Sequence, residues 1–192
     1  MKLHYELEYS ELEAENPLDW QTPEERGAWF VMSKRGYELP NEFDVDFEQY
    51  TSWQEIVNNI SSKPYKFVRW YEHSGVSVSL RDNPDINEWD AGIVGVIFGN
   101  SVEAIEQAFE PWKQYIEGDI WDVIIKDEQG ELVDAVCGFY GYEYAEAEAE
   151  AMLKQAQIDE NERAKQTRQA QKEVKQAITL AKKHGYILAK EV

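Results

Sequence analysis

Glu72, His73 and Asp90, in the middle of the chain, are the residues best suited to acid–base chemistry. An imidazole beside a carboxylate can serve as a general base, and Ser74 carries a hydroxyl that such a base would activate. However, Ser74 directly follows His73, so its oxygen does not easily reach the imidazole nitrogen, and no Gly-x-Ser-x-Gly elbow surrounds it. The tight turn over 73–75 explains the same residues. The enzyme hypothesis therefore requires Glu72, His73 and Asp90 to converge at one end of a sheet.

The residues that would hold a metal or a cofactor are scattered. His4, His73, His184 and Cys137 show no metal-ligand spacing. The oxygen-rich loop 82–90 lacks the spacing of a calcium loop and is interrupted by Pro84. Neither glycine pair, at 92 and 95 or at 138 and 141, continues into a phosphate-binding motif. The sequence thus predicts no cofactor and no metal, and it predicts that Cys137 is a small buried residue at a strand end.

The charge is divided along the chain. Residues 1–150 carry 33 acidic and 10 basic side chains, a net charge of −23, whereas residues 151–192 carry 5 acidic and 9 basic ones, a net charge of +4. All seven tryptophans lie in the acidic part. Such a field repels the phosphates of nucleic acids, so we expect no direct nucleic-acid binding by residues 1–150, and it attracts basic protein surfaces. Acidity that serves only solubility is the alternative.

The acidic loops supply the candidate partner-binding residues. Carboxylates in rows can imitate the phosphates of a nucleic acid, and loops are where binding groups concentrate. The candidates are Glu42, Asp44, Asp46, Asp82, Asp85, Glu88 and Asp90.

The elements that position these loops are short strands and two helices. Alternation predicts strands over 3–9, 65–71 and 76–80, and the apolar run 93–98 predicts a central strand covered on both faces. A helix capped by Thr51 or Ser52 is expected, and a second helix runs from Ser101 to about 117, where Pro111 predicts a kink or a break. Residues 119–126 and 131–137 form the clearest hairpin. We therefore predict an α+β fold with an antiparallel or mixed sheet of about five to seven strands and two packed helices.

A change of composition marks the last part of the chain. Residues 143–184 contain no glycine or proline and are rich in alanine, glutamate, glutamine and lysine, which predicts one long helix or two joined helices. The sequence predicts an acidic, aromatic-rich domain over 1–141 and a C-terminal helical extension over 142–192. Two weak alanine-rich stripes along the extension leave self-association through residues 143–184 as a possibility.

Three segments resemble a family of uncharacterised phage- and plasmid-encoded proteins. The segments are Trp70–Gly75, Trp89–Gly95 and Cys137–Gly141. In that family the corresponding motifs are YDHSG, WDSGQVG and CWGFYG, in the same order and with similar spacing. The match covers about residues 16–141 and departs at Glu72, Ala91 and Ile93, and by the absence of a tryptophan after Cys137. The resemblance implies an accessory gene on a mobile element and carries no catalytic residues.

Together these observations support a non-enzymatic accessory protein of a phage or mobile element. It would bind the basic surface of a host nucleic-acid-binding or defence protein, as a DNA mimic or anti-defence inhibitor. The first residues are acidic rather than apolar, and no apolar run is long enough to span a bilayer, so a cytoplasmic location in the host cell without membrane attachment is expected. The alternatives are an enzyme with a site near His73 and Asp90 and a scaffold that oligomerises through the C-terminal helix.

Overall fold

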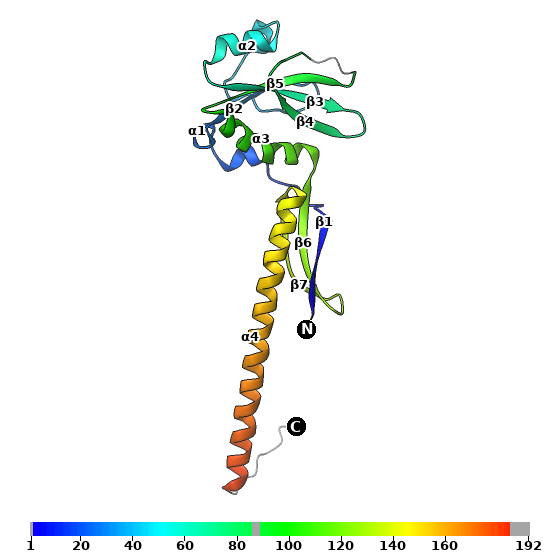
Figure 1. The fold of residues 1–192 in the computed structure, drawn as a ribbon, viewed down its shortest axis with the longest axis vertical. Helices are drawn as coiled ribbons and strands as arrows, with labels where there is room; N and C mark the ends of the chain where they lie inside the picture. Colours follow the sequence, from blue (N-terminus) through cyan, green and yellow to red (C-terminus); the bar gives the residue numbers. More distant parts are fainter. Residues whose placement is uncertain (1, 86–88, 185–192) are drawn as a thin grey trace. The chain divides into compact units, whose positions relative to one another are not determined.

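The computed structural model describes residues 2–85 and 89–184. It confirms the α+β fold, with seven antiparallel strands in two sheets, short helices and a long C-terminal helix (Figure 1). The strands are β1 (Leu3–Tyr9), β2 (Ala28–Met32), β3 (Tyr65–Glu72), β4 (Val76–Arg81), β5 (Ala91–Gly99), β6 (Ile120–Asp127) and β7 (Leu132–Tyr140). The helices are η1 (Pro17–Trp20), α1 (Pro23–Arg26), η2 (Phe47–Gln49), α2 (Trp53–Ile60), α3 (Val102–Glu117) and α4 (Tyr142–Lys183).

The chain forms two compact units. The first, which we call the helix unit, contains residues 1–8, 123–136 and 145–192, and the second, the aromatic unit, contains residues 9–122 and 137–144. α4 begins at Tyr142, where the composition of the sequence changes. The division into a domain over 1–141 and a C-terminal extension stays a prediction.

A four-stranded antiparallel sheet is the centre of the aromatic unit. Its order is β2-β5-β3-β4, so the apolar strand β5 lies between two neighbours, as its sequence predicts. Val94 forms a bulge, because Val68 pairs with Gly95 while the next residue, Arg69, pairs with Ile93. The bulge places Val94 on the same face as Ile97.

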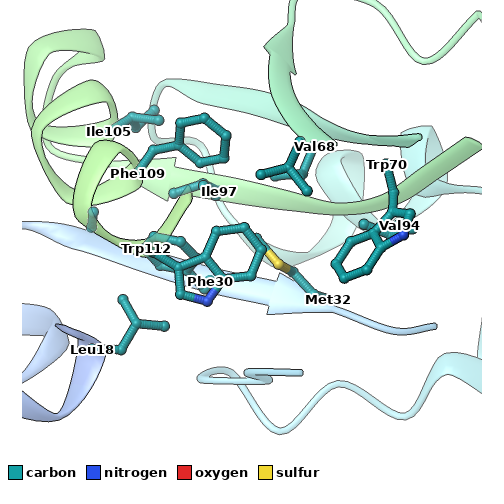
Figure 2. Close-up of a cluster of buried hydrophobic side chains, with 12 residues drawn as sticks. Leu18, Phe30, Met32, Val68, Trp70, Val94, Ile97, Ile105, Phe109 and Trp112 are labelled. Atoms are coloured by element: carbon teal, nitrogen blue, oxygen red, sulfur yellow. The ribbon is translucent and has the colours of Figure 1, made fainter. Parts of the chain in front are cut away.

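Each face of this sheet is covered by a helix and an apolar cluster. On one face α3 packs its apolar side over strands β2, β3, β4 and β5, with Phe30, Trp70 and Trp112 almost completely buried (Figure 2). On the other face α2 and the chain around Val45 cover Phe67 and Phe98. The two packed helices expected from the sequence are therefore on opposite faces of one sheet.

α3 begins and ends where the sequence predicts. The Ser101 hydroxyl accepts a hydrogen bond from the amide of Ala104 at 3.2 Å, a cap worth about 1 kcal/mol. Gly118, with a φ of 72°, ends the helix. Pro111 does not split α3, which runs unbroken past it.

In the helix unit, the first part of α4 lies beside the sheet formed by β1, β6 and β7 (Figure 1). Ala145 and Ala149 are fully buried, and Lys126 on β6 forms an ion pair with Glu6 on β1. Beyond this region the helix continues without cover, since residues 165–177 are all exposed. α4 is one helix rather than two joined helices. Across residues 2–85 and 89–184, no helix has both the length and the apolar character needed to cross a membrane.

Candidate partner-binding surface

The acidity of the protein is concentrated in the aromatic unit. Its segments 9–122 and 137–144 contain 24 acidic and 8 basic side chains, which gives a net charge of −16 out of −19 for the whole chain. The helix unit holds the remaining 14 acidic and 11 basic side chains, a net charge of −3. All seven candidate carboxylates of the acidic loops belong to the aromatic unit.

Glu42 is used inside the protein. Its carboxylate forms an ion pair with Arg26, whose side chain is only 6% exposed, and accepts a hydrogen bond from the amide of Phe30 at 2.7 Å. Arg26 also donates to the carbonyls of Leu18 and Gln21, at 3.1 and 2.7 Å. The Glu42 side chain therefore holds its loop against β2, and its negative charge is paired with Arg26 within the protein.

Asp44 and Asp46 lie on the exposed loop that follows. Asn41 fixes this loop, because its side chain exchanges two hydrogen bonds with the backbone of Val45, at 2.9 and 3.0 Å. Asp44 has a φ of 49°, and Asp46 accepts a hydrogen bond from the amide of Glu48 at 3.2 Å. Both carboxylates face solvent from a loop of defined conformation.

The carboxylates between β4 and β5 are spread along the sheet. Asp82 pairs with Lys66 near the beginning of β3, whereas the carbonyl of Asp90 accepts from the amide of Glu72 at the end of β3. These two contacts are made by Lys66 and Glu72, which are six positions apart on β3. At the rise of an extended strand this corresponds to about 20 Å. Asp85 is exposed between them, and Glu88 lies outside the described residues. The candidate residues thus form no single compact row.

Glu72, His73 and Asp90 converge at one end of the sheet. His73 Nδ1 lies 3.3 Å from Asp90 Oδ2, and the Glu72 carboxylate accepts from the Tyr37 hydroxyl at 2.7 Å and pairs with Lys34 Nζ at 3.2 Å. Hydrogen bonds from Tyr37 and Lys34 lower the pKa of Glu72, and the Glu72 carboxylate raises the pKa of Tyr37.

Among the residues that the structure describes, this cluster shows neither a nucleophile bonded to His73 nor a metal site. The His73 side chain is 70% exposed, and among the described residues no serine, threonine or cysteine side chain is hydrogen-bonded to its imidazole. In the same part of the chain, no group of three His, Cys, Asp or Glu residues could hold a metal ion. Trp89, which precedes Asp90, is fully exposed. Trp89 therefore offers an apolar contact beside these charges.

Two adjoining hollows in the aromatic unit were not anticipated. The acidic hollow, of about 270 Å³, is lined by Ser10, Leu12, Glu13, Ala14, Glu15, Trp20, Cys137, Gly138 and Tyr140. The apolar hollow, of about 570 Å³, is lined by Trp20, Gln107, Glu110, Pro111, Gln114, Gly138, Phe139, Tyr140 and Tyr144. Trp20, Gly138 and Tyr140 line both hollows. These three residues therefore form a shared wall between the acidic hollow and the apolar hollow.

Local structure explains how Trp20 reaches this wall. Asn16 caps η1 by accepting from the amide of Leu18 at 3.1 Å, and Leu18 is buried in the core below α3. Trp20, at the other end of the same turn, is left 51% exposed. Its ring meets the ring of Tyr140 edge to face, with centroids 5.1 Å apart.

The facing wall comes from the end of β7. Gly138 and Gly141 have φ values of 84° and 86°, a left-handed conformation that glycine adopts freely. The amide of Gly141 donates to the carbonyl of Asp119 at 2.8 Å, and the Tyr140 hydroxyl donates to the carbonyl of Glu15. The glycine pair at 138 and 141 therefore shapes the surface beside Tyr140.

The carboxylates of the acidic hollow are accessible to a binding partner. Glu13 and Glu15 are exposed, and neither has an ion-pair partner among the residues that the structure describes. Cys137 is exposed rather than buried, because its side chain lines this hollow instead of the core. Partial desolvation is the main cause that raises the pKa of the Cys137 thiol, and the hydrogen bond to the neighbouring Asp122 and its negative charge raise that pKa further. A raised pKa disfavours the thiolate form of Cys137.

Comparison of the chain with protein-family models, curated proteins and solved structures gave no match.

Proposed function

We propose that this protein is a non-enzymatic accessory factor of a phage or mobile element that binds a basic surface on a host nucleic-acid-binding or defence protein. The observation that carries the proposal is the net charge of −16 on the aromatic unit beside exposed aromatic side chains. Carboxylates speed the encounter with a basic partner, and aromatic side chains anchor it. By occupying the partner's phosphate-binding groove, the protein would act as a nucleic-acid mimic.

The proposal places the bound state at the adjoining hollows. An arginine of the partner enters the acidic hollow, where Glu13 and Glu15 neutralise it and the Trp20 ring offers a face for stacking. An apolar side chain next to that arginine enters the apolar hollow against Phe139 and Tyr144. Asp44 and Asp46, on their exposed loop, contribute to the long-range attraction.

Two synthetic peptides of equal charge test this arrangement. One alternates arginine with leucine and the other alternates arginine with glycine, and binding is followed by fluorescence anisotropy at low and high NaCl. The wild-type protein should bind the leucine peptide more tightly, and both affinities should fall as salt is added. Tyr144→Ala should remove the preference for leucine, because Tyr144 lines only the apolar hollow. Trp20→Ala and Glu13→Gln/Glu15→Gln should each weaken the binding of both peptides at low salt.

The matched control is Glu128→Gln/Glu131→Gln, which changes the charge equally on the exposed turn between β6 and β7. Its peptide affinities should stay close to those of the wild type. Equal affinity at low and high salt would contradict the electrostatic mechanism. A host protein captured at low salt should release DNA when the accessory protein binds it, which tests mimicry directly.

The contact between His73 and Asp90 favours a second candidate, an enzyme that uses His73 as a general base. In that case His73→Ala would remove the biological effect of the protein while leaving peptide binding intact. If the effect persists in His73→Ala, the enzyme hypothesis is excluded.

A further inference from the structure

The charges on α4 are separated into two halves of opposite sign. Residues 142–162 contain seven acidic side chains and one basic one, and residues 163–183 contain seven basic side chains and one acidic one. The first half therefore carries −6 and the second half +6. The same helix is continuous over all 42 residues, about 60 Å.

The helix dipole explains only the ends of this pattern. Glu143 in the first turn and Lys182 and Lys183 in the last turn oppose the partial charges of the helix termini. That effect fades within one turn, so it does not account for Glu150 or for Arg168, which lie well inside the helix.

One exposed face of α4 carries both signs. Glu143, Glu150, Lys175 and Lys182 are all exposed, and at 100° per residue they fall within an arc of about 60°. The buried residues Ala145 and Ala149 lie outside this arc. A second helix can therefore approach the charged face while the buried residues of α4 keep their own contacts.

We propose that α4 binds α4 of a second copy of this chain in an antiparallel orientation. A two-fold axis at the middle of the helix places Glu143 opposite Lys182 and Glu150 opposite Lys175. Both matches hold at once because the two glutamates are seven residues apart and the two lysines are seven residues apart. By symmetry, each contact is made twice. A parallel pair would instead place −6 against −6 and +6 against +6.

The attraction is mainly electrostatic. The charged face contains few apolar side chains, so the pair lacks the apolar seam of a stable coiled coil. Exposed ion pairs are individually weak and are screened by salt. The dimer should consequently form at low ionic strength and high protein concentration, and it does not depend on the proposed binding of a host protein.

Sedimentation equilibrium of the full chain at about 30 mM and 300 mM NaCl tests the proposal. At low salt the mass should rise toward two chains with concentration, and added salt should raise the dissociation constant at least about tenfold. Glu143→Lys/Glu150→Lys and Lys175→Glu/Lys182→Glu should each weaken the dimer by a similar factor. The quadruple variant that combines all four changes should recover it, because the halves are again complementary.

Glu128→Lys/Glu131→Lys, in the turn between β6 and β7, controls for the change in net charge, and circular dichroism verifies that each variant keeps its helix. A protein that stays monomeric at low salt over the accessible concentrations would overturn the proposal. A dimer whose affinity is unchanged when the charges of one half of α4 are reversed would overturn it as well. In a parallel pair each residue faces its own copy, so reversing the sign of one half would leave like charges facing like charges. Failure of the quadruple variant to recover would have the same consequence.

Discussion

The carboxylate of Glu72 accepts a hydrogen bond from the Tyr37 hydroxyl and pairs with Lys34, although these residues are far apart in the sequence. The Tyr37 ring also contacts Trp70, with ring centroids 4.7 Å apart. These contacts attach the segment after β2 to the end of β3. Glu72 thus has a structural partner, as Glu42 does through Arg26, so neither carboxylate is simply a free surface charge.

The hydrogen bond between Tyr37 and Glu72 requires a protonated phenol and an ionised carboxylate. The folded pKa of Glu72 lies below its ordinary value of 4.5, so the stabilisation is present above 4.5 and is lost as the pH falls through the folded pKa. The folded pKa of Tyr37 lies above its ordinary value of 10.0, so the stabilisation is present below 10.0 and is lost as the pH rises through the folded pKa.

Tyr37→Phe should therefore lower the Tm most between about pH 6 and pH 8, where both groups are in the required state. The difference from wild type should shrink in acid and in strong base, as measured by thermal unfolding across pH. Tyr65→Phe is the control, because the Tyr65 ring packs against Phe67. A Tyr37→Phe difference that stays constant with pH would argue against the hydrogen bond.

At the scale of elements, β5 determines how closely the strands of the aromatic unit pack. It lies between β2 and β3, and two of its glycines differ sharply in their surroundings. A Cβ at Gly95 would lie 2.5 Å from Met32 Cγ and 2.7 Å from the carbonyl oxygen of Val31. A Cβ at Gly92 would meet no atom within 4 Å. Close approach, rather than backbone conformation, is the reason that Gly95 is glycine.

Gly95→Ala should lower the free energy of unfolding by about 1–3 kcal/mol, because the added methyl group must displace β2. Urea denaturation followed by tryptophan fluorescence measures this change. Gly92→Ala, on the same strand, should leave the midpoint nearly unchanged. Equal effects of the two substitutions would show that β2 does not approach β5 at Gly95 as closely as described.

At the scale of the whole molecule, charge opposes compaction. The aromatic unit holds a net charge of −16, and much of it is exposed on loops. Repulsion among these carboxylates destabilises the folded unit and is screened as the Debye length falls from about 30 Å at 10 mM salt to about 10 Å at 100 mM.

Added NaCl should raise the Tm of the protein by several degrees between about 10 mM and 200 mM. The scan uses a protein concentration at which sedimentation shows one chain, so that dissociation of a dimer does not contribute. KCl should give the same increase, because screening depends on ionic strength rather than on the identity of the ion. A Tm that falls with salt would mean that favourable ion pairs outweigh the repulsion.

The sequence alone determined most of the strands and the longer helices of this protein, and the location of its charge. Apolar periodicity and the cap at Ser101 are local signals, and they predicted α2, α3 and the central strand β5. The acidity of residues 1–150 is a property of composition. The proposal of a basic partner rests on that acidity and stays a proposal.

The tertiary structure decided which of these residues meet. Strand pairing divided the strands into two sheets, placed Asp82 and Asp90 at different ends of β3, and brought His73 to Asp90. It also placed Trp20 against Tyr140. Sequence patterns are read over a few neighbouring residues, whereas pairing and packing join segments separated by many residues, so the hollows and the use of each carboxylate were settled only in three dimensions.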